Sequence, residues 1–419
     1  RVGDRVSALI NSDDPAGKFI WEVTSKALLY SSERLGEIAD DIVNIDRAMR
    51  WGFGWEMGPF EIWDSIGVSS TVATMQAENK VIPKWVSNML DKGNNKFYKH
   101  LDGFNCYWDV NKEDYLPIPA SPKELRFVNF KFNGSLIQDH WSASIVDLGD
   151  GVAGVDLHSV LKADLNPIDG SILQTFHSAL EWVKENSYVG LVISSDGPNF
   201  CAGANLTLIL NSAYRKDWDE LNRTVKIMQD ILQSIRYAPF PVVAAPFGFV
   251  FGGGFEIISA CDRIVAAGES YIGLVEVGVG LIPGAGGNLR MISNLSRKIK
   301  SAMPGAFPII QKAFETIGFA KVATSAKEAQ AIGYLQKEDH IVVNRDHILS
   351  EAKNEVISMS DSYEVPEVES FKLPGKSGRL VLEGTLKGFV KSGKISEHDT
   401  LIGRKLGYVL TGGKKGGPF

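Results

Sequence analysis

Two glutamates in glycine-rich segments are the residues of this sequence whose types and spacing best suit chemistry. Glu256 follows three glycines, Gly252 to Gly254, in the first turn of an apolar helical pattern. Glu276 lies 276 − 256 = 20 residues further on, in "YIGLVEVGVGLIPGAGG". Neither acid has an adjacent basic residue to pair with it. Two such carboxyl groups could hold one water molecule and move its protons.

A third glycine-bearing loop, "GPNFCAGANL" at 197–206, follows the strand pattern "GLVISSD". Backbone N–H groups from such a loop and from the start of a helix can converge on one oxygen atom and form an oxyanion hole, which the helix dipole strengthens. The neighbouring side chains must then be small, as Ala202, Gly203, Ala204, Gly252 and Gly253 are. A thioester carbonyl held there could carry enolate charge, and water could add to a neighbouring double bond.

Other glycine motifs are incomplete in this chain. A dinucleotide fingerprint would need glycine at positions that hold Ile257 and Leu289, and "PGKS" lacks the earlier glycine of a P-loop because that position holds Ser370. We therefore expect no nucleotide cofactor. A turn chosen for tight packing between strand and helix remains the alternative explanation of Gly252 to Gly254.

Composition restricts the classes of partner. The 419 residues carry a formal charge of −6, which argues against a nucleic-acid partner held by a broad basic field. No apolar run approaches the roughly 20 residues of a membrane span. The three widely spaced cysteines, Cys106, Cys201 and Cys261, are typical of reduced thiols and predict a cytoplasmic protein. No H-E-x-x-H motif or Cys/His cluster predicts a metal site.

Periodicity and proline content predict four regions. Residues 1–113 read as an all-helical domain, and residues 114–140, with Pro117, Pro119 and Pro122, read as a linker. Residues 141–350 alternate strand and helix patterns, which indicates an α/β layered core. Residues 351–419 read as a helical extension whose end, "TGGKKGGPF", is expected to be disordered.

Four motifs identify a family resemblance. "FCAGANL", "PVVAAPFGFVFGGGFEI", "ACDRIVAA" and "LVEVGVGLIPGAGG" occur in the order and spacing of the crotonase (enoyl-CoA hydratase) family. The resemblance covers about residues 141–345. It implies the crotonase-like α/β fold, a spiral of repeated ββα units.

The resemblance also implies roles for single residues. Ala204 and Gly253 match the two oxyanion-hole amides, and Glu256 and Glu276 match the two catalytic carboxylates, with Glu276 as the proton carrier to C2 and Glu256 as the water activator. Gly284 matches a backbone amide near the water, and Ala202 lies where the family's backbone meets the CoA adenine. One departure is Asn205, which stands where an aspartate is common.

These roles imply an enzyme that hydrates trans-2-enoyl-CoA to 3-hydroxyacyl-CoA in fatty-acid β-oxidation or related metabolism. Its partner would be an acyl-CoA thioester, with no metal and no cofactor bound by this chain. Two alternatives stay open: an enoyl-CoA isomerase, and a non-catalytic scaffold of an acyl-CoA multienzyme complex. The two retained glutamates favour hydration.

The first region carries a second resemblance. Asp46-Arg47-Ala48-Met49 and Gly58-Pro59-Phe60 resemble the C-terminal, helical domain of 3-hydroxyacyl-CoA dehydrogenases, over about residues 15–110. The order of the two domains resembles that of bifunctional dehydrogenase/hydratase enzymes. It implies that this chain is the C-terminal part of one, with NAD bound only by a domain further upstream. A homo-oligomer is left open.

Overall fold

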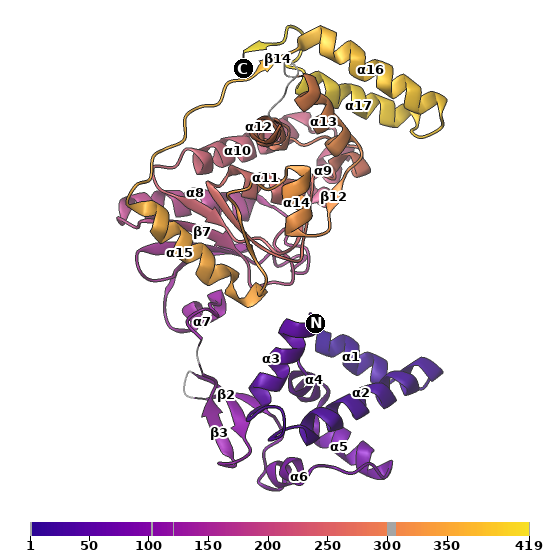
Figure 1. Ribbon diagram of the computed structural model, residues 1–419, viewed down its shortest axis with the longest axis vertical. Coiled ribbons are helices and arrows are strands. Elements are labelled where there is room, and N and C mark those ends of the chain that lie inside the picture. Colours follow the sequence, from indigo (N-terminus) through magenta and orange to yellow (C-terminus); the bar gives the residue numbers. More distant parts are fainter. Residues whose placement is uncertain (1, 102–103, 120, 300–306, 419) are drawn as a thin grey trace. The chain divides into compact units, whose positions relative to one another are not determined.

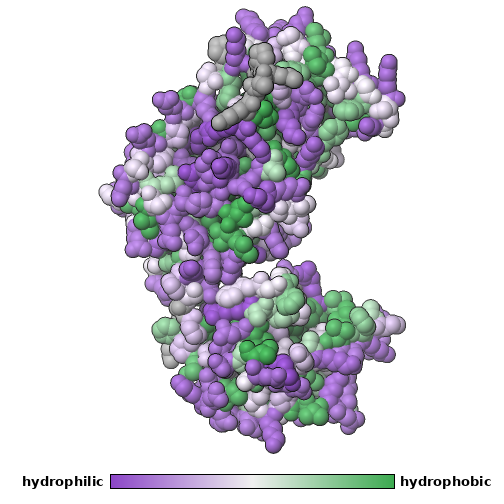
Figure 2. Space-filling view, in the orientation of Figure 1, coloured by the Kyte–Doolittle hydropathy of each residue, from purple (hydrophilic) through white to green (hydrophobic). Residues whose placement is uncertain are grey.

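The computed structural model describes residues 2–101, 104–119, 121–299 and 307–418, and divides the chain into two compact units, residues 1–120 and 121–419 (Figure 1). Each unit has its own buried apolar core. No helix in the described ranges combines the length and apolarity needed to cross a membrane. On the face shown in Figure 2, hydrophilic residues cover most of each unit and apolar residues form small separate groups.

The first unit is mainly helical. Its helices and strands are α1 Val2–Ile10, α2 Pro15–Glu33, α3 Ile42–Phe53, α4 Pro59–Ile66, α5 Val68–Ala77, α6 Lys84–Asp91, β1 Tyr98–Leu101, β2 Phe104–Asp109 and β3 Asp114–Pro117. The three strands form an antiparallel sheet in the order β1-β2-β3. The sequence predicts only helices before residue 113, so this small sheet is a correction. It is stabilised by buried Tyr107 and Trp108, which pack into the helical core.

A buried carboxylate ties α3 to α4. Asp46 accepts hydrogen bonds from the Phe60 amide at 2.8 Å, the Glu61 amide at 3.2 Å and the Tyr98 hydroxyl at 2.7 Å. A Cβ on Gly58 would lie 2.3 Å from the Cβ of Asp46, so glycine is needed for this approach. The Asp46 and Gly58-Pro59-Phe60 motifs are therefore two halves of one packing contact.

The second unit contains the α/β core. Its elements are α7 Phe127–Phe132, β4 Leu136–Asp139, β5 Ala143–Asp147, β6 Val152–Leu157, α8 Gly170–Glu185, β7 Gly190–Ser194, α9 Leu206–Tyr214, α10 Trp218–Arg236, β8 Val242–Ala244, β9 Gly248–Phe251, α11 Gly253–Ala260, β10 Arg263–Ala267, β11 Ser270–Gly273, the 3-10 helix η1 Glu276–Val279, α12 Gly287–Lys298, α13 Phe307–Gly318, β12 Val322–Ala323, α14 Ala326–Ile332, β13 His340–Val342, η2 Arg345–His347, α15 Ile348–Ser360, β14 Lys372–Leu373, α16 Gly375–Lys391, α17 Glu397–Leu410 and β15 Gly417–Pro418.

Two sheets position the loops of this unit. The larger runs β13-β10-β8-β7-β6-β5-β4, with β4, β5 and β6 antiparallel and the strands from β6 to β13 parallel. The smaller runs β12-β11-β9, with β9 and β11 parallel. Each chain segment β8-β9-α11 and β10-β11-η1 therefore contributes one strand to each sheet before a helix, which is the predicted repetition of ββα units.

Alternating side chains of the large sheet fill two cores. Ile145, Val155 and Ile193 point into one core with α8, α10 and α11, while Val146 and Val192 point into the other with α15. Such alternation follows from the two-residue period of a strand. Figure 1 shows α15 on one face of the sheet and α8, α10 and α11 on the other.

The prediction of a linker over residues 114–140 is wrong for most of that range. It contains β3, α7 and β4, and the units divide at residue 120 instead. Phe127 of α7 is fully buried in the α15 core, Arg126 pairs with Asp196 at 3.2 Å, and Lys131 pairs with buried Asp156 at 2.7 Å. Proline density misleads here because two of the three prolines lie outside regular elements while the residues around them pack.

The C-terminal region is helical, as predicted, but its tail is ordered through residue 418. Gly417–Pro418 pairs antiparallel with Lys372–Leu373. A Cβ on Gly416 would lie 2.6 Å from the Leu373 carbonyl oxygen, so the glycines of "TGGKKGGPF" permit close packing here. Composition alone does not distinguish this use of glycine from disorder.

Candidate active site

The glycine run places the two acids through backbone geometry. Gly252 has a φ of +51°, and a Cβ there would lie 3.1 Å from Glu276 Oε1. A Cβ on Gly254 would lie 2.3 Å from the Cys201 carbonyl oxygen. Any side chain at Gly254 would push α11 away from the 197–206 loop, and any at Gly252 would strain the turn and crowd Glu276. The run thus serves close packing, and that packing brings three loops together.

The 197–206 loop runs beside β9 and the segment before α8. The Cys201 amide donates to the Phe249 carbonyl at 3.0 Å, and the Phe251 amide donates to the Cys201 carbonyl at 3.0 Å. The Ile168 amide donates to the Gly203 carbonyl at 2.8 Å, and the Asn205 amide donates to the Ile168 carbonyl at 3.2 Å. The two bonds to Ile168 use the Gly203 carbonyl and the Asn205 amide, which lie on either side of Ala204. The N–H of Ala204 itself therefore points away from Ile168.

The amides of Ala204 and Gly253 lie close together. A Cβ on Gly253 would be 3.5 Å from the Ala204 nitrogen, and one on Gly203 would be 3.3 Å from the Gly253 nitrogen. Neither amide donates a hydrogen bond to another backbone group within the described ranges. Gly253 is also the first residue of α11, where the helix dipole adds positive potential. Two free donors close together, one of them at a helix start, suit a developing negative charge.

Glu256 is buried in α11 and held by the loop before α12. Its Oε1 accepts hydrogen bonds from the amides of Ala285 and Gly287, each at 2.8 Å. Burial raises the pKa of Glu256, and the amide hydrogen bonds from Gly287 and Ala285 oppose that rise. Because those bonds favour the charged form, Glu256 is the acid of the pair better stabilised as a carboxylate.

Glu276 begins η1 and has the opposite environment. Its Oε2 is buried and has no hydrogen-bond partner in the described part of the chain. Burial, followed by the nearby charge of Glu256, raises the pKa of Glu276 to about 8. The carboxyl group is therefore mainly protonated at neutral pH. Two acids whose surroundings separate their protonation states can act as a base and an acid.

Gly284 and Ala202 flank these groups. The Gly284 carbonyl accepts a hydrogen bond from Gln229 Nε2 at 2.6 Å, which ties α10 to the loop that holds Glu256. The Ala202 amide donates to the Leu165 carbonyl at 2.8 Å, while the Ala202 carbonyl accepts no backbone hydrogen bond within the described ranges. Neither residue is shown in contact with the two acids, although Gly284 adjoins Ala285.

Two other residues of the 197–206 loop have structural explanations. Cys201 is fully buried, and burial raises the pKa of its thiol to about 12, so it packs as a small apolar side chain. Asn205 is the N-cap of α9 and accepts hydrogen bonds from the amides of Thr207 and Leu208. Because Asn and Asp cap helices about equally well, the departure from aspartate keeps the loop's geometry.

Tyr334 contacts the site but is not among the site residues predicted from the sequence. Its buried hydroxyl donates to the Lys321 carbonyl at 2.7 Å and accepts from the Leu274 amide at 3.2 Å, two residues before Glu276. Its ring packs edge-on against Phe255, the neighbour of Glu256, with centroids 5.0 Å apart. Tyr334 thus touches both acid-bearing segments. No local sequence signal marks it, because the contacts depend on a distant turn after α14.

Within the described ranges no set of three His, Cys, Asp or Glu residues is arranged to hold a metal ion.

Two family models match this chain. Residues 148–304 match enoyl-CoA hydratase/isomerase, and residues 30–100 match the 3-hydroxyacyl-CoA dehydrogenase C-terminal domain. The matches fall in the second and first unit, respectively.

Curated relatives extend beyond this sequence. A protein of Bacillus subtilis named "Probable 3-hydroxyacyl-CoA dehydrogenase" is 43% identical over 411 residues, which are 98% of this chain and 51% of the relative. The fatty acid oxidation complex subunit alpha of Idiomarina loihiensis is 34% identical over 131 residues, 31% of this chain and 18% of the relative. The chain thus spans about half the length of the first relative and less of the second.

Solved structures that resemble this chain include enoyl-CoA hydratases. An enoyl-CoA hydratase of Bacillus anthracis is 22% identical, with a TM-score of 0.43, covering 64% of this chain and 90% of that one. One of Polaromonas sp. JS666 gives the same values. The domain assignment rests on the family models and on the ββα repetition described above. The chain joins a 3-hydroxyacyl-CoA dehydrogenase C-terminal domain to a domain of the enoyl-CoA hydratase/isomerase (crotonase) family.

Proposed function

We propose that the second unit hydrates trans-2-enoyl-CoA thioesters to 3-hydroxyacyl-CoA. The observation that carries this proposal is a pair of acids with different surroundings: buried Glu256 is held by two amides, and Glu276 has a buried Oε2 with no hydrogen-bond partner among the described residues. Beside them lie two free amides, that of Ala204 in the 197–206 loop and that of Gly253 at the start of α11. The family match supports acyl-CoA chemistry of the hydratase or isomerase type.

The mechanism begins with the thioester carbonyl oxygen accepting hydrogen bonds from the amides of Ala204 and Gly253. Glu256, as the carboxylate, takes a proton from water, and the water oxygen bonds to C3. The C2–C3 double bond becomes the enolate, whose charge the two amides stabilise; one such donor is typically worth about 3 kcal/mol. Glu276 then gives its proton to C2, and before the next turnover the proton taken by Glu256 passes to Glu276, so both acids return to their starting states. Water is added in full, with no oxidation, so the reaction needs no redox cofactor.

Further parts of the proposal concern binding. The Ala202 carbonyl would accept a hydrogen bond from the adenine amino group of CoA, and the Gly284 amide would donate to the attacking water. The partner is the acyl-CoA thioester, in the cytoplasm, with a homo-oligomer left open. The Bacillus subtilis relative is named a dehydrogenase of 3-hydroxyacyl-CoA, which is the product proposed here.

The test is to incubate the purified chain with crotonyl-CoA. We expect loss of the ultraviolet absorbance of the conjugated thioester and a product heavier by one water. An isomerase would instead convert a trans-3-enoyl-CoA to the conjugated form without a change of mass, and a scaffold would do neither. Either of those results would contradict the proposal.

A further inference from the structure

The segment that holds the Glu256 carboxylate has few restraints of its own. This segment, residues 282–285, lies between η1 and α12 and carries the Ala285 amide that bonds Glu256. Within the described ranges, no hydrogen bond between backbone groups involves residues 282–285. A backbone segment without such bonds has many conformations open to it, so side chains must select the observed one.

Gln229 and Glu256 hold one peptide group of this segment from its two ends. A trans peptide group is planar, so its carbonyl and its N–H point in opposite directions. The carbonyl, on Gly284, accepts a hydrogen bond from Gln229 Nε2 at 2.6 Å. The N–H, on Ala285, donates to Glu256 Oε1 at 2.8 Å. Gln229 on α10 therefore sets the direction from which this N–H approaches the acid.

Asn288, in the first turn of α12, holds the preceding peptide group in the same way. Its Nδ2 donates to the Pro283 carbonyl at 2.8 Å, which sets the direction of the Gly284 N–H. Asn288 is buried, and its Oδ1 has no hydrogen-bond partner among the described residues. A buried oxygen without a partner is costly, and an apolar side chain would avoid that cost. The bond to Pro283 offsets it.

We infer that Gln229 and Asn288 are positioning residues of the candidate active site. They orient two successive peptide groups, one toward Glu256 and the other toward the attacking water. The inference rests on the proposed function, which assigns proton transfer to Glu256 and contact with the water to the Gly284 amide. Both side chains act through the backbone.

The protonation of Glu256 is the property that Gln229 controls. Burial raises the pKa of Glu256 and the amide bonds oppose that rise, so a displaced Ala285 amide should raise the pKa further. Glu276 of η1 is the acid beside Glu256, and Tyr334 is a further titratable group near the pair. The charged groups around Cys261, at the far end of α11, are Arg236, Asp262, Arg290 and Asp339. The variants below change none of these groups.

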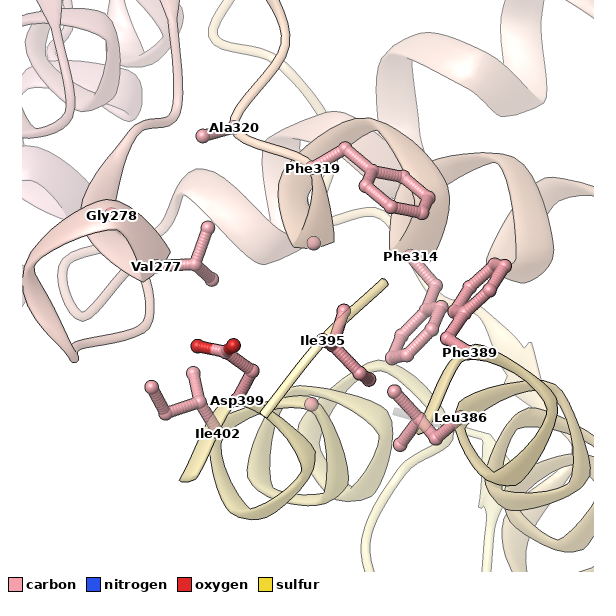
Figure 3. A pocket seen from close by; sticks show the side chains of 12 residues that line it. Val277, Gly278, Phe314, Phe319, Ala320, Leu386, Phe389, Ile395, Asp399 and Ile402 are labelled. Atoms are coloured by element: carbon pink, nitrogen blue, oxygen red, sulfur yellow. The ribbon is translucent and has the colours of Figure 1, made fainter. Parts of the chain in front are cut away.

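The same variants leave the neighbouring cavity unaltered. Figure 3 shows a pocket of about 310 Å³ whose walls include Val277 and Gly278 of η1 and residues of α13, α16 and α17. Gln229, Asn288 and residues 282–285 are not among its lining residues. Substitutions of Gln229 and Asn288 therefore test the segment and not that pocket.

The first measurement is the pH dependence of crotonyl-CoA hydration by Gln229→Met, which keeps the length of the side chain and removes the donor. The fall of kcat/KM at acidic pH should begin about one pH unit higher, because a hydrogen bond to a charged group is weakened, while KM stays nearly unchanged. Gln233→Met is the matched control: Gln233 is half-buried on the same helix and bonds no residue of 282–285 within the described ranges. A Gln229→Met profile that coincides with wild type, or that is lowered equally at every pH, overturns the inference.

The second measurement is the turnover of Asn288→Ala. Its kcat should fall about tenfold with little change in KM, because the water loses its orienting N–H. Ser350→Ala is the control, since it removes buried hydrogen bonds to the Lys123 and His347 carbonyls on α15. Thermal unfolding should show stability losses in both variants, but only Asn288→Ala should lose turnover. Equal losses of kcat would mean that Asn288 has only a structural role, and if Asn288→Ala does not fold, Gln229→Met decides.

A titration without turnover separates the two proposals. Carbon-13 NMR of protein labelled at the glutamate carboxyl carbon follows Glu256 directly, with Glu256→Gln identifying its signal. The pKa of Glu256 should be higher in Gln229→Met than in wild type and unchanged in Gln233→Met. An unchanged pKa in Gln229→Met, in a protein that hydrates crotonyl-CoA, overturns the positioning role and leaves the proposed function intact. A raised pKa in a protein that hydrates no enoyl-CoA supports the positioning role and contradicts the proposed function.

Discussion

At the scale of single residues, the distinction between the two acids is set by their hydrogen-bond partners. Glu256 is buried and held by amides, whereas Glu276 is half-buried, has an Oε2 without a hydrogen-bond partner among the described residues, and has a pKa raised to about 8. The spacing of the acids is visible in the sequence. Their different protonation is not, because it depends on the loop at Ala285 and Gly287 folding back onto α11.

The raised pKa of Glu276 predicts a pH profile. The protonated form is the proton donor to C2, so kcat/KM should be level at neutral pH and fall as pH rises through about 8, approaching tenfold per pH unit. The measurement is the initial hydration rate across that range, with circular dichroism to show that the protein stays folded. A profile that rises or stays level through this region contradicts the assignment.

Tyr334 gives a second prediction at this scale. Tyr334→Phe keeps the ring against Phe255 and removes the hydroxyl that bonds Leu274 and Lys321. We expect kcat to fall several-fold with little change in KM, and stability to fall by about 1 kcal/mol. Tyr363→Phe is the control, because its hydroxyl bonds Ala238 and Asp262 rather than the acid-bearing segments. Equal losses of kcat in the two variants would mean that Tyr334 has only a structural role.

At the scale of elements, the segment 361–371 carries the chain from α15 on one face of the sheet to the α16–α17 pair on the other (Figure 1). Glu369 attaches this segment to α12. Its carboxylate accepts a hydrogen bond from the Ser293 hydroxyl at 2.6 Å, forms an ion pair with Arg297, and lies 3.9 Å from the Arg290 guanidinium. Burial alone would raise the pKa of Glu369, but the hydrogen bonds from Ser293 and Arg297 outweigh it and hold the pKa below its ordinary value.

Glu369→Gln should therefore destabilise the second unit, by about 1–3 kcal/mol, because buried Arg290 loses its opposite charge. Since the pKa of Glu369 is depressed by folding, its contribution is present at neutral pH and lost as pH falls through the folded value. Thermal unfolding at neutral and acidic pH measures this. The variant should differ from wild type mainly at neutral pH. Glu367→Gln, an exposed acid of the same segment, should have no effect. Equal effects of the two substitutions would refute the role of Glu369.

The helices and strands also differ in how well the sequence predicts them. The strand and helix patterns around β5 to β11 are long and regular, so the sequence predicts them well, and the ββα repetition follows from their order. The β1–β3 sheet and α7 escape prediction because they are short and lie among prolines and charged residues. Their stability comes from Trp108 and Phe127 packing against distant parts of the chain.

At the scale of the whole molecule, the site lies entirely within the second unit, so that unit should hydrate enoyl-CoA without residues 1–120. The residue at which a shortened chain begins should decide whether the second unit folds. A chain beginning at Ser121 keeps Phe127 and the Lys131–Asp156 pair, whereas one beginning at Trp141 exposes the apolar surface under Phe127 and leaves Asp156 buried and unpaired. We expect soluble, active protein from the first and little folded protein from the second. Comparable yield and activity from both would show that α7 and β4 are dispensable.

The central claim is that Glu256 and Glu276 together add water to the enoyl-CoA. The most direct test is the turnover of crotonyl-CoA by Glu256→Gln and by Glu276→Gln, with Glu269→Gln, an exposed acid between β10 and β11, as the matched control. Each amide keeps the shape of the acid but can neither take nor give the proton, so both variants should lose at least about a hundredfold in kcat while the control keeps wild-type turnover. Near wild-type turnover by either the Glu256 or the Glu276 variant would contradict the account.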